Sequence, residues 1–462
     1  MKEQSQRLGT QPIPKLLANL SIPAMIGMFV MALYNVIDTL FIARGVGILG
    51  VSGVSIGFPV MMIIMAISAA VGIGGASVIS RRLGEDKPEE ADQVFGNILF
   101  MIVAVSSFGL IGAFTFLEPL LKLFGATENI LPYATDYLFP IMLGSIFFSF
   151  AFTTNSIIRS EGNSKFAMMT MIIPAVLNII LDPIFIFGLN MGVQGASVAT
   201  VLSQATVTIV VLNYFLKGRS SLTIKAAYLK PQWKVIKEIL TIGMPAFIRQ
   251  VSGSGMMIAI NLMLIKFGGE FEVGVFGIVQ KLAMFTIMPM IGVLQGMQPI
   301  IGYNYGANND SRLKETVLLG MKVVTVISTG IFVVMMVFPE GLMNIFTGDT
   351  ETIETGAYAI RIMFALAMLI GAQVVSGGLY QALGMAKPAL ILSMARQVLF
   401  LIPLVLILPN FFGVTGVWLA FPLSDLLAFA LSMIFLYKDR RLFFKSKKDA
   451  PPYEATEKPF SI

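Results

Sequence analysis

The chain of 462 residues contains no cysteine and no histidine, and only 13% of its residues are charged. Without cysteine it can form neither a disulfide nor a thiolate site. Without histidine it lacks an imidazole proton relay and the commonest protein ligand of metals. Any proton that this chain carries must therefore bind a carboxylate or, failing that, a lysine or a tyrosine.

Catalytic motifs are also missing from the sequence. It has no Walker lysine loop, no HExxH and, without histidine, no Ser or Cys triad of the usual kind. The glycine-rich stretch at 72–77 is not a dinucleotide loop, because no strand is predicted before it. We expect no enzymatic activity, no cofactor and no ATP-driven transport by this chain alone.

Hydrophobic residues are abundant: they make up 56% of the chain, and the mean hydropathy is +0.83. A soluble domain would carry about 25% charged residues, and apolar runs of roughly 17–25 residues are long enough to cross a bilayer. The sequence therefore predicts an all-α membrane protein with about twelve transmembrane helices. The predicted spans are 15–43, 48–80, 91–117, 132–159, 164–187, 193–216, 235–265, 272–303, 313–338, 357–384, 387–409 and 413–437.

The distribution of Lys and Arg predicts the orientation. The polar segment 1–15 leads into an apolar run too long for a signal peptide, so the first span is expected to be retained. If the N-terminus is cytoplasmic, the outside loops hold only Arg44, Lys122 and Lys266, and nearly all other basic residues lie inside. This is the positive-inside pattern, and it predicts a multi-pass protein of the cell membrane with both termini in the cytoplasm. The net charge of +6 is explained in this way without nucleic acid as a partner.

The two halves of the sequence repeat each other. A shift of 222 residues aligns landmarks of the first half with landmarks of the second, and a shift of 221 aligns one later pair, although chance matches between hydrophobic segments are the alternative. Because each half holds an even number of spans, the repeats would be parallel, with a pseudo-two-fold axis along the membrane normal. The aligned positions are Pro23 with Pro245, Gly84 with Gly306, Gly162 with Gly384, Lys165 with Lys387 and Gly192 with Gly413.

This duplication predicts the domain organisation. We expect an N-terminal six-helix lobe at 1–215, a cytoplasmic linker at 216–234 and a C-terminal six-helix lobe at 235–437. The remaining segment 438–462 is polar and proline-rich, and its basic cluster is expected to contact anionic lipid headgroups.

Two aspartates, Asp38 and Asp182, lie inside long hydrophobic runs of the first half. A carboxylate in hydrocarbon costs about 2.5–3.5 kcal/mol, so such residues usually face a cavity and carry function. Both lie about 9 Å below the predicted outer ends of their spans, at 1.5 Å per residue. The shifted positions in the second half are Ile260 and Pro403, so only the N-terminal lobe has this acidic pair.

Polar companions extend the acidic pair into a candidate cation site. Tyr34 and Asn178 precede Asp38 and Asp182 by one helical turn, on the same helix faces, and Asn155 and Thr200 are further candidates. Such a site would hold one proton, or bind Na⁺ between two anions, so that cation occupancy is coupled to conformation. The alternatives are that Asp38 reaches the membrane interface, that Asp182 marks a helix break before Pro183, or that the pair is a structural hydrogen bond.

Two other features have predicted structural roles. Arg396 and Asp425 lie deep in the last two spans and are expected to form an ion pair that stabilises the C-terminal lobe, with Arg249 as the rival partner. Pro23, about four turns below Asp38, is the candidate hinge, because proline frees a backbone carbonyl and permits a bend. A static kink is the alternative.

Taken together, the motifs resemble the multidrug and toxic compound extrusion (MATE) family, and its prokaryotic DNA-damage-inducible F branch in particular. The resemblance covers about residues 10–440 and rests on IPAMIGMFVMALYNVIDTLFIARGVG, IPAVLNIILDPIFIFGLNMGVQGASVATVLSQ, ISRRLGE, IGYNYGA and the duplication. It implies secondary active efflux of organic cations and amphipathic drugs in exchange for H⁺ or Na⁺. It also implies an N-lobe site built from Tyr34, Asp38, Asn155, Asn178, Asp182 and Thr200.

The chain departs from part of this family pattern in its second half. Members proposed to bind Na⁺ in the C-terminal lobe carry acids in spans 7 and 10, whereas 235–265 holds only Glu238 and 357–384 holds none. We therefore expect ion coupling in the N-terminal lobe, by alternating access of a monomer. A lipid or lipid-linked oligosaccharide flippase of the same superfamily is the alternative, although it would require a strongly cationic central cavity.

Overall fold

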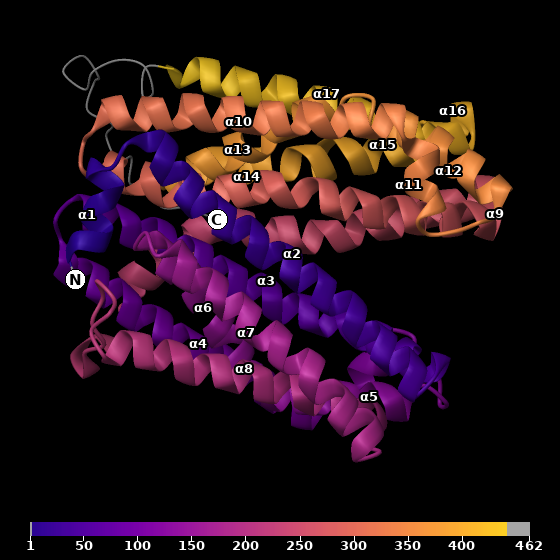
Figure 1. Cartoon of the computed structure of the whole chain (residues 1–462), viewed down its shortest axis with the longest axis horizontal. Coiled ribbons are helices and arrows are strands. Elements are labelled where there is room, and N and C mark those ends of the chain that lie inside the picture. Colours follow the sequence, from indigo (N-terminus) through magenta and orange to yellow (C-terminus); the bar gives the residue numbers. More distant parts are fainter. Residues whose placement is uncertain (1, 441–462) are drawn as a thin grey trace, which may run out of the picture.

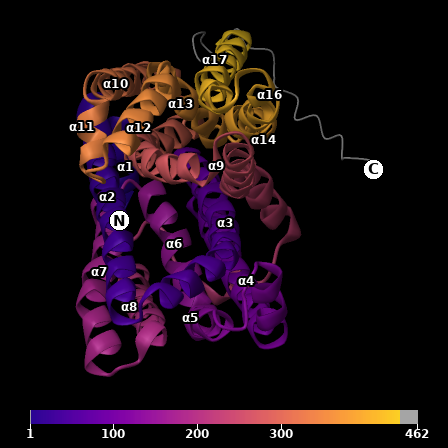
Figure 2. The ribbon, with the colours of Figure 1, turned by 90° about the vertical axis from the view of Figure 1, so that its right-hand side faces the viewer.

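The computed structural model describes residues 2–440, and these residues fold into two six-helix lobes. Most of the basic tail predicted at 438–462 lies outside the described residues. In Figure 1 the first lobe occupies the lower half and the second lobe the upper half, and Figure 2 shows the same two bundles end-on. The first lobe contains α1 (Lys2–Thr10), α2 (Ile13–Gly45), α3 (Ile48–Gly84), α4 (Pro88–Leu123), α5 (Leu131–Leu143), α6 (Ser145–Ser160), α7 (Ser164–Pro183), the π-helix η1 (Ile184–Gly188) and α8 (Gly192–Leu216).

The second lobe follows a linker at 217–232, which includes the short 3₁₀ helix η2 (Ala226–Leu229). The lobe contains α9 (Trp233–Gly306), α10 (Asp310–Val337), α11 (Pro339–Asn344), α12 (Thr350–Met363), η3 (Ala367–Leu369), α13 (Ile370–Ala382), α14 (Ala386–Met394), the π-helix η4 (Ala395–Leu401), α15 (Ile402–Ile407), α16 (Pro409–Phe412) and α17 (Val414–Lys438).

Breaks and turns within the helices explain how these elements form twelve membrane crossings. Helix α9 has 74 residues and would be about 110 Å long if straight, several bilayer thicknesses. Its backbone turns at Gly269, where φ is 77°, so it crosses twice. Two further crossings are bent pairs, α5 with α6 at 59° and α12 with α13 at 46°. The predicted number of spans and their order are confirmed.

Backbone φ angles at equivalent positions of the two halves repeat, as expected for a duplicated chain. Gly47 and Gly269 both have positive φ, 85° and 77°, and lie 222 residues apart. The same shift relates Gly162 to Gly384, with φ 87° and 77°. It also relates Asp86 to Asn308, two residues other than glycine with φ of 56° and 57°. Positive φ is uncommon for residues other than glycine. The matching φ values of Asp86 and Asn308 therefore show that the corresponding loops of the two halves have the same conformation.

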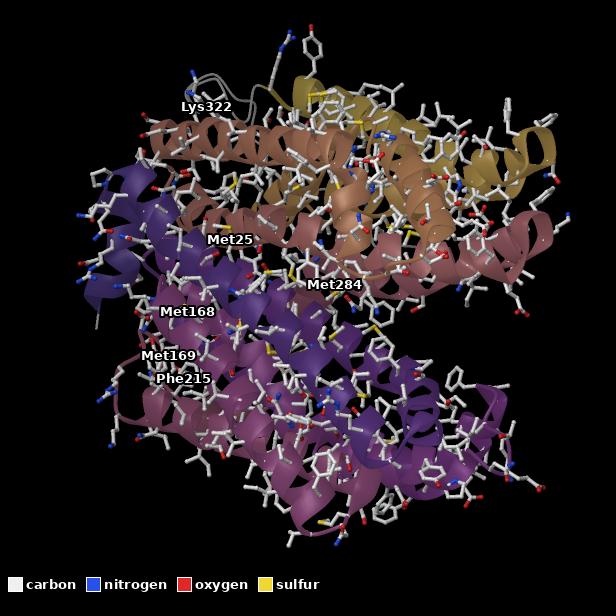
Figure 3. All side chains as sticks on the ribbon, turned by 45° about the vertical axis from the view of Figure 1, so that its right-hand side comes forward. Met25, Met168, Met169, Phe215, Met284 and Lys322 are labelled. Atoms are coloured by element: carbon white, nitrogen blue, oxygen red, sulfur yellow. The ribbon has the colours of Figure 1, made fainter. Side chains whose placement is uncertain are left out.

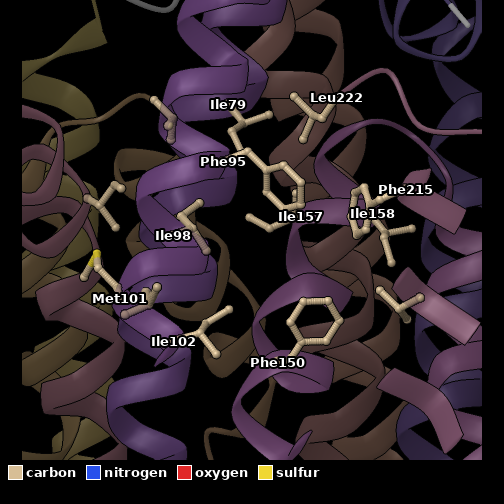
Figure 4. Packing of buried hydrophobic residues seen from close by; sticks show 14 of the residues in the cluster. Ile79, Phe95, Ile98, Met101, Ile102, Phe150, Ile157, Ile158, Phe215 and Leu222 are labelled. Carbon is tan, nitrogen blue, oxygen red and sulfur yellow. The ribbon is translucent and has the colours of Figure 1, made fainter. Parts of the chain in front are cut away.

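The lobes exchange the first turns of their leading helices. Leu16 and Leu20 of α2 pack in the core of the second lobe with Ile300, whereas Ile236 and Ile239 of α9 pack in the core of the first. Figure 4 shows part of this first-lobe core, including Phe95, Ile98 and Ile157. Each leading helix therefore crosses from one lobe to the other just before Pro23 or Pro245. The sequence did not predict this exchange.

Close backbone contacts join the lobes at one end, the linker end, which carries α1, the linker, Gly84 and Gly306. A Cβ atom added at Gly74 would lie 2.2 Å from the carbonyl oxygen of Ile239, and one added at Gly296 would lie 2.2 Å from Ser21 Oγ. Gly74 and Gly296 are equivalent under the 222-residue shift. Figure 3 shows the lobes diverging from one end of the molecule toward the other. We call the opposite end, which carries the chain turns at Gly47 and Gly269, the distal end.

Polar contacts hold this end together as well. Glu238 of α9 accepts from Arg81 and Arg82 of α3, at 3.2 and 3.4 Å. The linker is bound to the first lobe: Glu161 accepts from Ser220 and from the backbone N–H of Ser221. Burial raises the pKa of the Glu161 carboxyl to about 7.

We predict that Gly74→Leu parts the lobes at the linker end. The new side chain would overlap the backbone of α9, which has no flexible group there to move aside. The readout is a single cysteine introduced as Gln298→Cys, at a small cavity between the lobes, in a chain that has no other cysteine. A water-soluble maleimide should modify it several-fold faster in Gly74→Leu than in the parent protein.

The matched control is Gly330→Leu, because Gly330 lies on an exposed helix face with no neighbouring atom where Cβ would stand. It should leave the modification rate unchanged. An unchanged rate in folded Gly74→Leu would show that this contact does not close the linker end.

Candidate functional site

The structure brings Asp38 of α2 and Asp182 of α7 together inside the first lobe. Their carboxyl groups lie within hydrogen-bonding reach of each other. Asp182 is 0% exposed and Asp38 is 8% exposed, so both lie away from lipid-facing surfaces. The predicted equal depth in spans 1 and 5 thus corresponds to direct contact.

Buried oxygen atoms without hydrogen-bond donors define the chemistry of this pair. Among the described residues, no donor serves Asp38 Oδ1 or either carboxylate oxygen of Asp182. The carbonyl Oδ1 of Asn178 is also buried without a donor. Carboxylate oxygens accept but cannot donate unless protonated, and buried acceptors are normally satisfied. These four oxygens are acceptors that a bound proton or cation would satisfy.

Polar side chains from other helices surround the pair. Asn178 Nδ2 donates to Thr200 Oγ1 of α8 at 3.0 Å, and the Asn178 side chain also lies within hydrogen-bonding reach of Asp182. Tyr34 lies beside Thr200 and both acids. Five of the six predicted residues, the two acids with Tyr34, Asn178 and Thr200, therefore meet as expected on helices α2, α7 and α8.

Tyr137 of α5 belongs to this cluster, although the sequence did not identify it. It is buried and lies close to Tyr34, Asp38 and Asp182. Its span holds Tyr133 four residues earlier, and this i,i+4 pair of phenols was the available signal.

The structure places Asn155 away from the acidic pair, which corrects the prediction that it extends this cluster. Its Nδ2 donates to Thr170 Oγ1 at 2.8 Å and to the carbonyl oxygen of Ala167 at 2.7 Å. Thr170 precedes Asp182 by more than three helical turns, about 18 Å along α7. Asn155 instead lines a separate cavity.

This cavity, which we call the N-lobe cavity, has a volume of about 110 Å³. Its apolar lining includes Met31, Phe148, Phe152 and Met171, and polar groups come from Asn155, Arg159 and Gln295 among others. Thioether and aromatic side chains adapt to apolar ligands of different shape. The cavity is therefore suited to amphipathic molecules.

The acidic cluster and the cavity adjoin on three helices. Met31 precedes Tyr34 by three residues on α2, and Pro174 precedes Asn178 by four on α7. On α8, Gln204 of the cavity follows Thr200 by four residues. Residues three or four apart share a helix face, so the acidic cluster and the cavity lining lie one helical turn apart on each of the three helices.

Irregular backbone positions Asp182 at the end of its helix. Pro183 has no backbone N–H and cannot continue the α-helical bonding, and the π-helix η1 (Ile184–Gly188) follows it directly. Gly195 lets α8 approach this turn, since an added Cβ there would lie 2.9 Å from the carbonyl of Phe185. Single π-turns of this kind occur frequently at functional sites.

The second lobe has an ion pair in place of an acidic pair. Arg396 Nε donates to Asp425 Oδ1 at 2.6 Å, with side chains 25% and 0% exposed. Arg396 lies on the π-helix η4, and Gln373 Nε2 donates to the backbone carbonyl of Asp425 at 2.6 Å. The partner of Asp425 is therefore Arg396 and not Arg249.

Pro23, the predicted hinge, lies inside the uninterrupted helix α2 and is buried. Its neighbours Ser21 and Met25 face Gly296 and Gly292 of α9 across the lobe interface. Its position fits a hinge, and the bending role remains a prediction.

Known transporters share this architecture. A duplicated bundle with a buried acidic site and no catalytic set is the architecture of a secondary transporter. The MatE family model matches residues 23–184 and 245–407, the two halves related by the duplication. The chain belongs to the MATE family, and it is a multidrug efflux transporter and not an enzyme.

Individual relatives cover nearly the whole chain. The multidrug export protein MepA of Staphylococcus aureus strain MRSA252 is 27% identical over 440 residues, 95% of this chain and 97% of MepA. A solved structure of the MATE multidrug transporter DinF-BH, bound to a ligand, is 63% identical, with a TM-score of 0.89 over 96% of this chain and 99% of that one. An outward-facing MATE transporter of the MOP superfamily is 27% identical, with a TM-score of 0.88 over 94% of this chain and 99% of that one.

We predict that the Arg396 and Asp425 side chains stabilise the second lobe as a unit. Arg396→Met alone should lower the free energy of unfolding by about 3–5 kcal/mol, because it leaves a buried carboxylate unpaired. Arg396→Met combined with Asp425→Leu should cost clearly less than the two single changes added together. Denaturant titration of the purified protein in detergent measures both, and additive losses would contradict the pairing.

Proposed function

We propose that this transporter exports organic cations and amphipathic drugs in exchange for H⁺ or Na⁺, and that the Asp38/Asp182 pair carries the coupling ion. The observation that supports this most is the set of four buried acceptor oxygens without donors. A proton on one carboxyl, or Na⁺ among the oxygens, would satisfy them. The drug would occupy the neighbouring N-lobe cavity.

Ion binding would change the conformation through the cost of burying charge. While both carboxylates are ionised, closing apolar helices around them is unfavourable. A bound cation removes that cost, so the ion favours a contracted chamber. Because the chamber shares α2, α7 and α8 with the cavity, contraction would displace the drug, and drug binding would in turn release the ion.

The orientation that we propose places the linker end in the cytoplasm. This end carries the basic residues of the linker and of the α3–α4 turn, whereas the distal end carries Arg44, Lys122 and Lys266. Positive residues accumulate on the cytoplasmic side of membrane proteins. With the lobes in contact at the linker end, the structure would then represent an outward-facing state of a protein in the cell membrane.

Transport would require the lobes to part at the linker end and to meet at the distal end. Pro23 and Pro245 lie where the leading helices cross between lobes, so bending there would reorient one lobe against the other. Exposed side chains such as Phe114 and Ile209, each 68% exposed, would contact lipid. We propose that a monomer carries out this cycle.

We predict that Asp38→Asn abolishes ion-driven export while leaving the protein folded. The amide has the shape of the carboxyl but cannot exchange a proton or neutralise Na⁺. Efflux of a cationic dye from vesicles with an imposed pH or Na⁺ gradient should fall about tenfold or more, within the usual range of coupling free energies.

The matched control is Asp136→Asn, because Asp136 is an exposed aspartate of α5. It should export the dye at the parent rate. Full export by Asp38→Asn would refute the assignment of the coupling site.

A further inference from the structure

Arg159 is a half-buried cation that the coupling mechanism does not use. It lies in the last turn of α6, where the N-lobe cavity meets the interface between the lobes. Its Nη1 donates to Gln295 Oε1 of α9 at 2.9 Å, and its Nη2 donates to Ser156 Oγ at 3.1 Å. Both acceptors are neutral, so these bonds leave the positive charge unbalanced.

Three other arginines within the membrane-embedded part have carboxylate partners, whereas Arg249 has no salt bridge within residues 2–440 and Arg312 donates to backbone carbonyls of Leu8 and Gln11. Arg81 and Arg82 share Glu238, and Arg396 has Asp425. Within residues 2–440 no Asp or Glu side chain forms a salt bridge with Arg159 or acts on it at short range. Charged residues within membrane spans are normally paired or face a substrate pathway. Arg159 faces a cavity, and its counter-ion is missing from the described chain.

Helix α6 presents a graded surface to this cavity. Phe148, Phe152, Asn155 and Arg159 all line it and are spaced by three or four residues, so they share one helix face. The two phenylalanine rings stack with centroids 5.7 Å apart. From Phe148 to Arg159 the helix rises about 16 Å, close to the length of an elongated drug. The side chains that α6 presents to the cavity thus change along the helix from the aromatic rings to the amide of Asn155 and the guanidinium of Arg159.

We propose that the Arg159 end of the N-lobe cavity is a binding subsite for an anionic group of an aromatic amphiphile, such as a carboxylate or sulfonate. This inference rests on the proposed drug-binding role of that cavity and assigns to Arg159 the anionic group of a zwitterionic ligand. A guanidinium has five N–H donors in a planar fork that matches a carboxylate. The aromatic body of the ligand would lie against Phe148, Phe152 and Met31.

The lobe interface gives this subsite a place in the transport cycle. Gln295 belongs to the second lobe, so its bond to Arg159 exists only while the lobes meet at the linker end. When they part there, the guanidinium loses that partner, and the anionic group of a ligand can replace it. Release at the distal side would then follow as Gln295 returns to Arg159.

The test uses two dyes that differ in a single group. Rhodamine 6G is an ethyl ester and a cation, whereas rhodamine 19 is the corresponding free acid and is zwitterionic at neutral pH. Fluorescence polarisation on the purified full-length protein in detergent gives both dissociation constants. The readout is the ratio of the two, because a general change in cavity shape affects both dyes and cancels.

Two variants remove the unbalanced charge in different ways. Arg159→Gln deletes it, and Gln295→Glu supplies a carboxylate next to Arg159 without a change in side-chain size. Each should weaken rhodamine 19 relative to rhodamine 6G by about tenfold or more, as expected for loss of a charge-assisted hydrogen bond. Arg159→Lys should retain part of the preference. The control Arg219→Gln neutralises an exposed linker arginine and should leave the ratio unchanged.

The outcomes separate this inference from the proposed function. If the parent protein exports rhodamine 6G but does not bind rhodamine 19, or if neither variant changes the ratio, the anion subsite is refuted and cation export stands. If the parent protein binds and exports neither dye, the proposed function itself fails. Since Gln295→Glu alters no side-chain volume, a misfolded Arg159→Gln variant would still leave the inference open to refutation.

Discussion

The arrangement of the first lobe depends on carboxylate oxygens that the folded chain leaves without donors in a hydrocarbon environment. Burying an unpaired charge is costly, and a protein normally avoids the cost by pairing or by neutralisation. Asp38 and Asp182 have neither among the described residues. Under the proposed function the counter-ion comes from outside the chain, and a counter-ion that enters and leaves is what an antiporter requires.

In the second lobe, which has the same architecture, a buried carboxylate is paired with a cation of the chain itself. The duplication preserves the loops, as the matching φ values of Gly47 and Gly269 show, but Ile260 and Pro403 occupy the positions of the acids. There Asp425 has its own counter-ion in Arg396. The buried carboxylate of the second lobe thus has its counter-ion within the chain, whereas under the proposed function the acidic pair of the first lobe takes an exchangeable ion. Arg159 also lacks a counter-ion within residues 2–440, but its charge is positive.

The sequence predicted those properties that follow from spacing along single helices. Depth in the membrane follows from residue counts, so the meeting of Asp38 and Asp182 could be anticipated. Contacts between helices that are distant in the chain could not. Asn155 was misplaced because sequence does not fix its height relative to the acids, and Tyr137 was missed because its helix is bent from α6 by 59°. The exchange of leading turns between lobes depends on glycine contacts such as Gly74 with Ile239, which involve backbone atoms of both halves.

The most direct measurement of the central claim is the competition between drug and ion at equilibrium. The affinity of the purified full-length protein for rhodamine 6G would be measured by fluorescence polarisation across a range of pH and of Na⁺ concentration. The account predicts that affinity falls as H⁺ or Na⁺ rises, and that this dependence disappears when both Asp38 and Asp182 are replaced by asparagine. The account would be contradicted if the affinity for rhodamine 6G did not change with pH or with Na⁺ concentration, or if such a change persisted when both aspartates are replaced.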